Sequence, residues 1–439
     1  MKVVEIILLY TVVTVSSNSD YKNYDDTTRN KRDIALFMYL QSEKNLIVSG
    51  NTNQNEYFTS KKSNGINEEP NKSIFDIPSI YDFTVAREKR KVRRLALYKW
   101  NTSLCYKFKD YDNTNLVRKV LRLIQKETCL RFSEKNYFEA NDKCLKFVSG
   151  NFCNTTIGRE KSKRSHTITI APSCSTFGEI FKLIFNALGV YDEHQRFDRD
   201  RYLFLDIENA QEDSKSLFSR VPAEDTNTFG VHYDYGSITH GGPFYHSNKN
   251  RKTIITRDPF YARTIGQREN PSFLDFQLLN RYYCQNSCPN LNIRCFNEAY
   301  LNPKKCGVCK CPSGFTGPTC KNTIKKSHNC GKTLIKAKRR ESYLKLSGHK
   351  YCIIHLVANV GEKIAIYLIT SAMYPNGPQI CTSLNSLEIK YWRRKAPTGA
   401  RFCQTTANKM LVSQNHHVIL IYKSTNPKNW FRILFKSTK

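Results

Sequence analysis

Sixteen cysteines constrain the fold of this chain more than any other feature of its sequence. None of them lies in residues 1–104, so the cross-linked part of the protein begins late in the chain. An even and large number of cysteines is typical of proteins that fold in an oxidising compartment. We therefore expect a disulfide-bonded, extracellular protein whose N-terminal part lies outside the cross-linked region.

The N-terminus has the pattern of a secretory signal peptide. Residues 1–17 contain one early lysine, an apolar run from Val3 to Val15, and small residues at 16 and 17. This run is too short to span a bilayer, and no other stretch is apolar enough to do so. A buried N-terminal helix is the alternative, which the polar residues that follow disfavour. We expect a secreted protein without a transmembrane anchor, with three N-x-S/T glycosylation sites at Asn71, Asn101 and Asn154.

The formal net charge of +31 predicts affinity for polyanions such as sulfated glycans or other anionic matrix. Secretion argues against nucleic acid as a partner. The charge is uneven, because residues 330–439 hold 19 Lys and Arg against three Glu and no Asp. For any single cluster, a solvated charged face is the alternative. The predicted basic patch consists of Lys336, Lys338, Arg339, Arg340, Arg393, Arg394 and Lys395.

Residues 18–94 are expected to form a pro-segment. Most of this stretch is rich in Asn, Lys and Ser and has few sustained apolar patterns, which is typical of a pro-segment or a disordered arm. The basic run at 87–94, REKRKVRR, comes just before the chain turns regular. We predict processing after Arg90 or Arg94, and a solvated basic linker is the alternative.

From residue 95 onward the pattern predicts a mixed α+β domain. Short apolar runs at 105–108, 146–148 and 167–170 indicate strands, and residues 116–128 and 272–283 indicate helices. A third helix is expected from residue 178, because Phe181, Ile184, Phe185 and Leu188 recur at helical spacing. Gly189 is well placed to end it, and a charged RFDRD run follows.

Two smaller modules follow at 285–322 and 330–439. CKCPSGFTGPTC, at 309–320, has the cysteine spacing and turn residues of an EGF-like domain; a zinc knuckle fits poorly, since no histidine lies at ligand spacing. Alternating apolar runs in 330–439 indicate short strands of a β-sandwich. The EGF-like pattern implies Cys288–Cys306, Cys295–Cys309 and Cys311–Cys320, and the last module offers two equally spaced pairs, Cys330–Cys352 and Cys381–Cys403.

Residues 95–284 resemble the catalytic domain of the astacin family of zinc metalloendopeptidases, which belong to the metzincins. The motifs that carry the resemblance are ETCLRF at 127–132, GEIF…ALGVYDEHQRFDRDRY at 178–202, YDYGSITH at 233–240 and IGQR at 265–268. The layout resembles nematode astacins with an EGF-like and a CUB-like module. It implies a mixed twisted sheet with an active-site helix, followed by a CUB-like β-sandwich. It also implies the disulfides Cys129–Cys284 and Cys153–Cys174, which leaves Cys105–Cys144 as a pair by arithmetic alone.

The same resemblance assigns each active-site position, and most of them are replaced. The three histidine ligands of the family fall on Lys182, Asn186 and Asp192, and the general-base glutamate falls on Leu183. The tyrosine that faces the zinc becomes Gly241. A protonated lysine offers no lone pair to a metal, and leucine cannot take a proton from water. We therefore expect no catalytic residue, no metal ligand set and no cofactor, with zinc only if the chain is active after all.

Two hypotheses concern the residues that remain. The Lys182 ammonium would take the place of the zinc cation, held by Asp192 and Asn186, because the turn brings position 192 back to the helix face. The alternative is that all three are solvated polar residues. Glu193 is intact, and its family counterpart pairs with the buried N-terminus of the mature protein.

These observations favour a secreted pseudoprotease that binds extracellular proteins or peptides, or anionic matrix, without cutting them. The alternative is an active zinc metalloendopeptidase that cleaves extracellular proteins. A third possibility is that the basic C-terminal module carries the function and the protease-like domain is a spacer. Because residues 330–439 contain no aspartate, we expect no calcium site in the CUB-like module.

Overall fold

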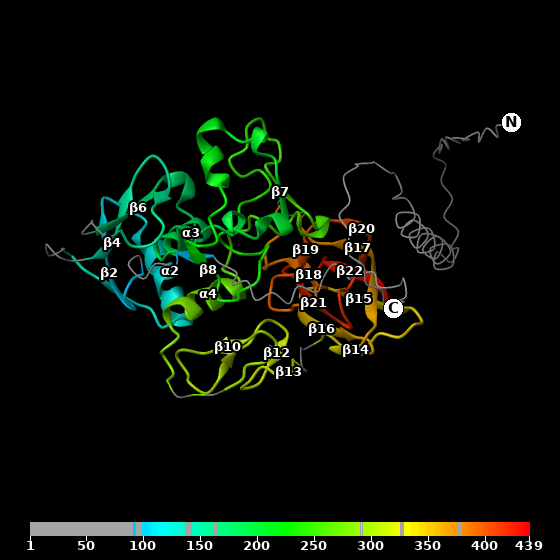
Figure 1. Cartoon of the computed structure of the whole chain (residues 1–439). Helices are drawn as coiled ribbons and strands as arrows, with labels where there is room; N and C mark the ends of the chain where they lie inside the picture. Colours follow the sequence, from blue (N-terminus) through cyan, green and yellow to red (C-terminus); the bar gives the residue numbers. More distant parts are fainter. Residues whose placement is uncertain are drawn as a thin grey trace, which may run out of the picture. The chain divides into compact units, whose positions relative to one another are not determined.

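The computed structural model describes residues 91–93, 99–136, 143–160, 165–289, 291, 293–324, 329–375 and 380–439 (Figure 1). All described residues belong to one compact unit within 84–439. The expected signal peptide, the expected pro-segment up to Arg90 and the acceptor site Asn71 lie outside the described residues. Within the described part, no helix is both long and apolar enough to cross a membrane.

A five-stranded sheet forms the base of the first domain, in the order β3-β2-β4-β6-β5. β2, β3, β4 and β6 run parallel, and the short β5 joins β6 antiparallel at the edge. Helix α2 packs its apolar stripe of Val117, Val120, Leu121 and Ile124 into the same core as this sheet. The bounds are Ser103–Lys109 (β2), Thr114–Glu127 (α2), Arg131–Glu134 (β3), Cys144–Ser149 (β4), Asn154–Thr155 (β5) and Ser165–Ile170 (β6).

Helix α3, Phe177–Ala187, holds the positions on which the interpretation depends. It begins where the Thr176 side chain accepts a hydrogen bond from the Glu179 amide, as an N-cap should. It ends at Ala187, and Gly189, with a φ of +93°, lets the chain turn away from the helix. α3 and α4, Phe273–Tyr283, share the core of the sheet, and α4 begins with a capping box of Ser272 and Asp275.

Short elements precede α3 or connect it to α4. β1 pairs with β8, and β7 pairs with β9, each antiparallel. The bounds are Val92–Arg93 (β1), Pro172–Cys174 (η2), Glu193–Gln195 (η3), Arg199–Arg201 (η4), Leu203–Leu205 (β7), Ile207–Asn209 (η5), Glu212–Phe218 (η6), Thr226–Asn227 (β8), Ile254–Thr256 (β9) and Pro259–Tyr261 (η7).

The cysteine-dense module contains two small antiparallel ladders, and the C-terminal module is a β-sandwich. The sandwich has a five-stranded sheet, β14-β16-β21-β18-β19, and a four-stranded sheet, β15-β22-β17-β20. The ladders are Tyr300–Leu301 (β10) with Cys309–Lys310 (β11) and Phe315–Thr316 (β12) with Asn322–Thr323 (β13). The sandwich strands are Leu334–Lys336 (β14), Ser342–Ser347 (β15), Tyr351–Val357 (β16), Lys363–Ala372 (β17), Ser386–Lys390 (β18), Ala400–Phe402 (β19), Thr406–Val412 (β20), His417–Lys423 (β21) and Trp430–Thr438 (β22).

The expected α+β class with a C-terminal β-sandwich is confirmed. All sixteen cysteines are paired, and none is free. Small modules bury too little apolar surface to be stable by packing alone, and disulfide bonds stabilise them instead. The cysteine-dense module, with its short strands, is such a module. The eight disulfides are the expected ones: Cys105–Cys144, Cys129–Cys284, Cys153–Cys174, Cys288–Cys306, Cys295–Cys309, Cys311–Cys320, Cys330–Cys352 and Cys381–Cys403.

One loop of the sandwich packs against the first domain. The Trp392 ring lies 4.9 Å from that of Tyr261, and its Nε1 donates to Asp258 at 3.1 Å. Further along, the Thr398 amide donates to Asp234 Oδ1 at 3.0 Å. These contacts bury a polar and aromatic loop that a sequence pattern alone would place at the surface.

This contact corrects the basic patch predicted from the sequence. Lys395 is 6% exposed, and its burial lowers the pKa of its ammonium to about 7. Arg393 and Arg394 are exposed, but Arg394 forms an ion pair with Glu298 at 3.1 Å. Arg394 therefore contacts another module and Lys395 is buried, whereas Arg393, Lys336, Lys338, Arg339 and Arg340 are exposed.

Candidate functional site

The turn after α3 brings together the three residues at the expected metal-ligand positions. Lys182 Nζ lies 2.9 Å from Asp192 Oδ2. Asn186 Nδ2 donates to Asp192 Oδ1 at 3.3 Å and to the Val190 carbonyl at 2.8 Å. The helix and the returning loop are therefore linked by an ion pair and two hydrogen bonds, in the arrangement that the first of the two sequence hypotheses describes.

This ion pair is largely shielded from solvent. The side chains of Lys182 and Asp192 are 13% and 9% exposed. Burial alone would lower the pKa of the Lys182 ammonium, but the Asp192 carboxylate outweighs it and the net shift of the pKa is upward. Burial would likewise raise the pKa of Asp192, and Lys182 reverses this so that the pKa falls. Both groups are charged at neutral pH, so the solvated alternative does not describe this site.

The expected general-base and tyrosine positions, Leu183 and Gly241, hold no reactive group. The Leu183 side chain is buried in the apolar core of the domain. At Gly241, an added Cβ would lie 2.8 Å from Ile254 Cδ1 and 3.1 Å from Tyr245 Cγ. The Tyr245 ring thus fills the space beside residue 241, and its hydroxyl lies 3.5 Å from Lys182 Nζ.

The donor set does not fit a catalytic zinc ion. Zinc in such sites takes three lone-pair donors and keeps one open position, and here a protonated ammonium and an amide stand at two of the three positions. The Lys182 ammonium already occupies the side of Asp192 that a cation would use. Among the described residues, no group of three or more His, Cys, Asp or Glu side chains could hold a metal.

Two buried histidines contact the backbone of Gly241, and both are neutral. His194 Nδ1 accepts a hydrogen bond from the Gly241 amide at 3.2 Å, and burial lowers the pKa of His194 to about 4. His240 Nδ1 lies 2.7 Å from the Gly241 carbonyl, so it carries the proton, and Nε2 accepts from the Tyr233 hydroxyl at 2.8 Å. Burial lowers the pKa of His240 to about 3. These rings are hydrogen-bonded parts of the packing.

A network of buried charges packs beside the turn after α3. Arg196, which is 1% exposed, binds both carboxylate oxygens of Asp198 at 2.8 and 2.9 Å, and lies 3.3 Å from Glu193. The Lys91 ammonium forms an ion pair with Glu193 and lies 3.6 Å from Asp275 Oδ1. Each buried charge therefore has an opposite charge beside it, as burial requires.

Glu193 thus has a partner that the sequence interpretation missed. In this chain the Lys91 side chain fills the place expected for a mature N-terminus, whose pairing with Glu193 stays a prediction for the processed protein. The signal was available, because Lys91 directly follows the predicted cut after Arg90. Tyr245 was also missed, since nothing in its sequence position ties it to Lys182.

The two predicted glycosylation sites within the described residues, Asn101 and Asn154, are both exposed.

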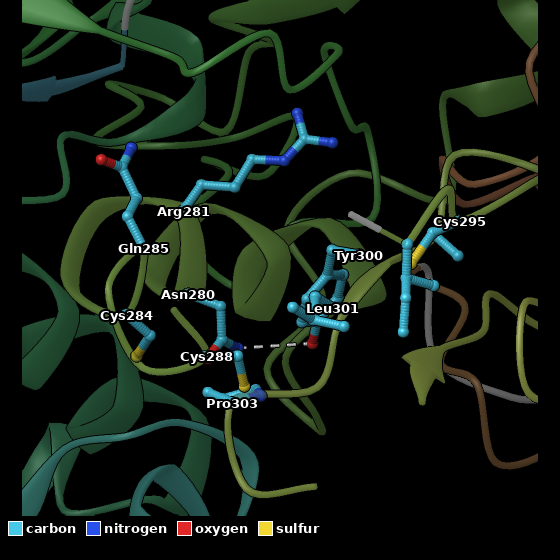
Figure 2. Close-up of a pocket in the computed structure, with 11 residues that line it drawn as sticks. Asn280, Arg281, Cys284, Gln285, Cys288, Cys295, Tyr300, Leu301 and Pro303 are labelled. Atoms are coloured by element: carbon cyan, nitrogen blue, oxygen red, sulfur yellow. Dashed lines mark hydrogen bonds between the residues drawn. The ribbon is translucent and has the colours of Figure 1, made fainter. Parts of the chain in front are cut away.

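A cavity of about 340 Å³ lies between α4 and the cysteine-dense module. Figure 2 shows Asn280 of α4 hydrogen-bonded to the Tyr300 hydroxyl, at 3.4 Å. Its lining includes no carboxylate, no histidine and none of the residues around Lys182. It is therefore separate from the candidate site.

Comparison with known proteins places these features in a family. Residues 92–284 match the family model described as Astacin, which is a family of peptidases. The chain is 34% identical to zinc metalloproteinase nas-34 of Caenorhabditis elegans over 77% of its own length, and 31% identical to zinc metalloproteinase nas-36 of Brugia malayi over 82%. It spans 56% and 63% of the length of these two relatives.

A solved structure is similar to part of this chain. High choriolytic enzyme 1, a hatching enzyme zinc-protease from the medaka fish Oryzias latipes, is 25% identical, with a TM-score of 0.40 over 44% of this chain and 98% of that one. The family match and the two nematode relatives cover the helix, the glycine turn and the charged run described above. Through residues 92–284, this chain belongs to the astacin family of peptidases.

Proposed function

We propose that this chain is a secreted astacin-family pseudoprotease, which binds extracellular partners without cleaving them. The observation that carries the proposal is the ion pair of Lys182 and Asp192 at two metal-ligand positions, with Leu183 at the general-base position. Without a metal or a base, no group activates water for attack on a peptide bond. The buried charge network around Arg196 stabilises the fold of the domain. A folded domain still offers a surface that partners can bind.

The proposed organisation follows the sequence: signal peptide 1–17, pro-segment 18–94, peptidase-like domain 95–284, EGF-like module 285–322 and CUB-like module 330–439. The apolar run at the N-terminus and the eight disulfides support secretion. Exposed acceptor sites at Asn101 and Asn154 support glycosylation. The partners are extracellular proteins or peptides, or anionic matrix, and not nucleic acid.

The test measures zinc and proteolysis on the purified, processed protein. We expect no stoichiometric zinc by elemental analysis and no chelator-sensitive cleavage of a denatured generic protein. A positive control carries Lys182→His, Leu183→Glu, Asn186→His and Asp192→His together, and its matched partner carries Leu183→Gln in place of Leu183→Glu. Stoichiometric zinc with chelator-sensitive cleavage by the unaltered protein would establish the alternative, an active endopeptidase like the named relatives.

A further inference from the structure

The outward face of the four-stranded sheet is strongly basic. Strand register places Tyr343 and Lys345 of β15, Trp430, Arg432 and Lys436 of β22, and Lys363 of β17 on the same side, opposite the apolar core. We call these six residues the basic sheet face. Residues next to them on each strand, such as Leu346, Ile433 and Ile364, point into the core of the sandwich, while Leu434 shares the outward side. Figure 1 shows the four strands in the orange-to-red region of the chain.

Two like charges stand directly opposite each other on this face. Lys345 and Arg432 are Cα partners across β15 and β22, and both are exposed. None of the four strands contains an aspartate or glutamate. Within the described part of the chain, neither Lys345 nor Arg432 forms an ion pair, while Lys436 reaches Glu341 at the edge, at 3.3 Å. Like charges opposite each other cost stability, and a bound anion would reverse that cost.

Aromatic rings flank the two cations. Tyr343, two residues before Lys345, is 54% exposed. The Arg432 guanidinium lies 5.0 Å from the centre of the half-buried Trp430 ring. Accessible rings offer flat apolar surface for sugar rings, and guanidinium and ammonium groups offer charge-assisted hydrogen bonds for sulfates.

The basic surface continues past the edge of the sheet. The Ser437 amide of β22 donates to the Lys338 carbonyl at 2.8 Å, which fixes the exposed residues 338–340 beside the end of β22. A hollow of about 490 Å³ at this edge is lined by Lys336, Lys338 and Arg339, with Glu362 as its one acidic residue. Cations therefore extend from Lys345 to residue 340, in a strip that suits a long polyanion rather than a single ion.

We propose that the basic sheet face binds a linear sulfated polysaccharide, with the edge at 336–340 extending the contact. The inference rests on the proposed binding function, and names the surface and the class of ligand. Charge complementarity selects a polyanion, and accessible rings beside the cations favour a sulfated glycan over an acidic peptide. Binding weakens as salt rises, because exposed charges are screened.

The experiment uses heparin as the probe and the full secreted protein in a surface-binding assay at physiological salt. Lys345→Thr with Arg432→Thr should weaken binding about tenfold or more, since each removes a charge-assisted contact. The matched control, Lys332→Thr with Arg393→Thr, also removes two exposed charges of the same module and should change affinity by less than about twofold. Tyr343→Ser should weaken binding while leaving its salt dependence unchanged.

Three results would overturn the proposal: equal loss in both double variants, no loss in either, or equal binding of heparin and desulfated heparin. Polyglutamate binding as tight as heparin would assign the face to an acidic protein instead. Unfolding midpoints guard against misfolding, and the Lys345 and Arg432 variant should be no less stable, because a like-charge pair is gone. Zinc content and proteolysis of the same samples report on the proposed function separately, since neither depends on this face.

Discussion

The turn after α3 and the charged network behind it differ in what has been replaced. At the turn, the ligand, base and tyrosine positions that the resemblance assigns hold Lys182, Leu183 and Gly241. Behind it, Glu193, Arg196 and Asp198 form a buried network of opposite charges. On this assignment the groups that carry the chemistry are replaced, whereas Glu193, to which the resemblance gives a structural role, is intact.

The difference shows that a metal site has two separable roles. A zinc ion both activates water and ties the helix to the returning loop. In this chain the Lys182–Asp192 ion pair and the Asn186 hydrogen bonds make the same tie, at 2.9 Å and 3.3 Å. With this tie in place, the buried charges of Glu193, Arg196 and Asp198 need no change to compensate for the absence of a metal. Four expected outcomes, from the largest to the smallest, test this comparison.

Acid should destabilise the protein most. His194 and His240 are neutral in the folded protein, where their pKa values are lowered to about 4 and about 3. In the unfolded chain each histidine has its usual pKa of about 6.5, so below that pH the unfolded chain binds more protons than the folded protein. Stability is present above pH 6.5 and falls between pH 6.5 and 4, by on the order of 2–3 kcal/mol per ring. Guanidinium unfolding midpoints at several pH values measure this. A flat profile down to pH 4.5 would show that these rings are not buried as described.

Removing Arg196 should be the most harmful single substitution in the network. Arg196→Ala leaves Asp198 buried without its cation and Glu193 with Lys91 alone, at a cost of about 3–5 kcal/mol. Arg220→Ala is the control, because this exposed pair with Asp200 contributes about 0–1 kcal/mol. Both are measured by chemical unfolding with the disulfides intact. Equal midpoints for the two variants would contradict a supporting role for the network.

The replaced site should behave as a coupled pair. Lys182→Met leaves the Asp192 carboxylate without its cation, and we expect a loss of about 2 kcal/mol, less than for Arg196 because Lys182 keeps some contact with water. Asp192→Asn should cost a similar amount. In a double-mutant cycle, the two together should cost much less than their sum. Strict additivity would show that the ion pair ties nothing together.

Tyr245→Phe should have the smallest effect. The hydroxyl is 3.5 Å from Lys182 Nζ, at the outer limit of a hydrogen bond, while the ring itself fills the space beside Gly241. We expect a loss under about 0.5 kcal/mol. A loss of about 2 kcal/mol or more would mean that the hydroxyl, and not the ring, carries this contact.

Local pattern was enough for several elements. The apolar spacing of Phe181, Ile184 and Phe185 predicted α3, and the structure places it at Phe177–Ala187 with Gly189 after it. Helix periodicity and positive φ are properties of a few adjacent residues, so they can be read locally. The loop around Trp392 shows the limit, because its charges suggested a surface patch and its contacts bury Lys395.

The sequence by itself determined the fold class and the family motifs, and it predicted the loss of the metal ligands, since residue type alone decides whether a side chain can donate a lone pair to zinc. Only the tertiary structure decided that Lys182 faces Asp192, that Lys91 reaches Glu193, and that Lys345 stands opposite Arg432. Burial and pairing depend on residues far apart in the chain. The sequence therefore predicts the charge of each group, but it does not predict which group pairs with it.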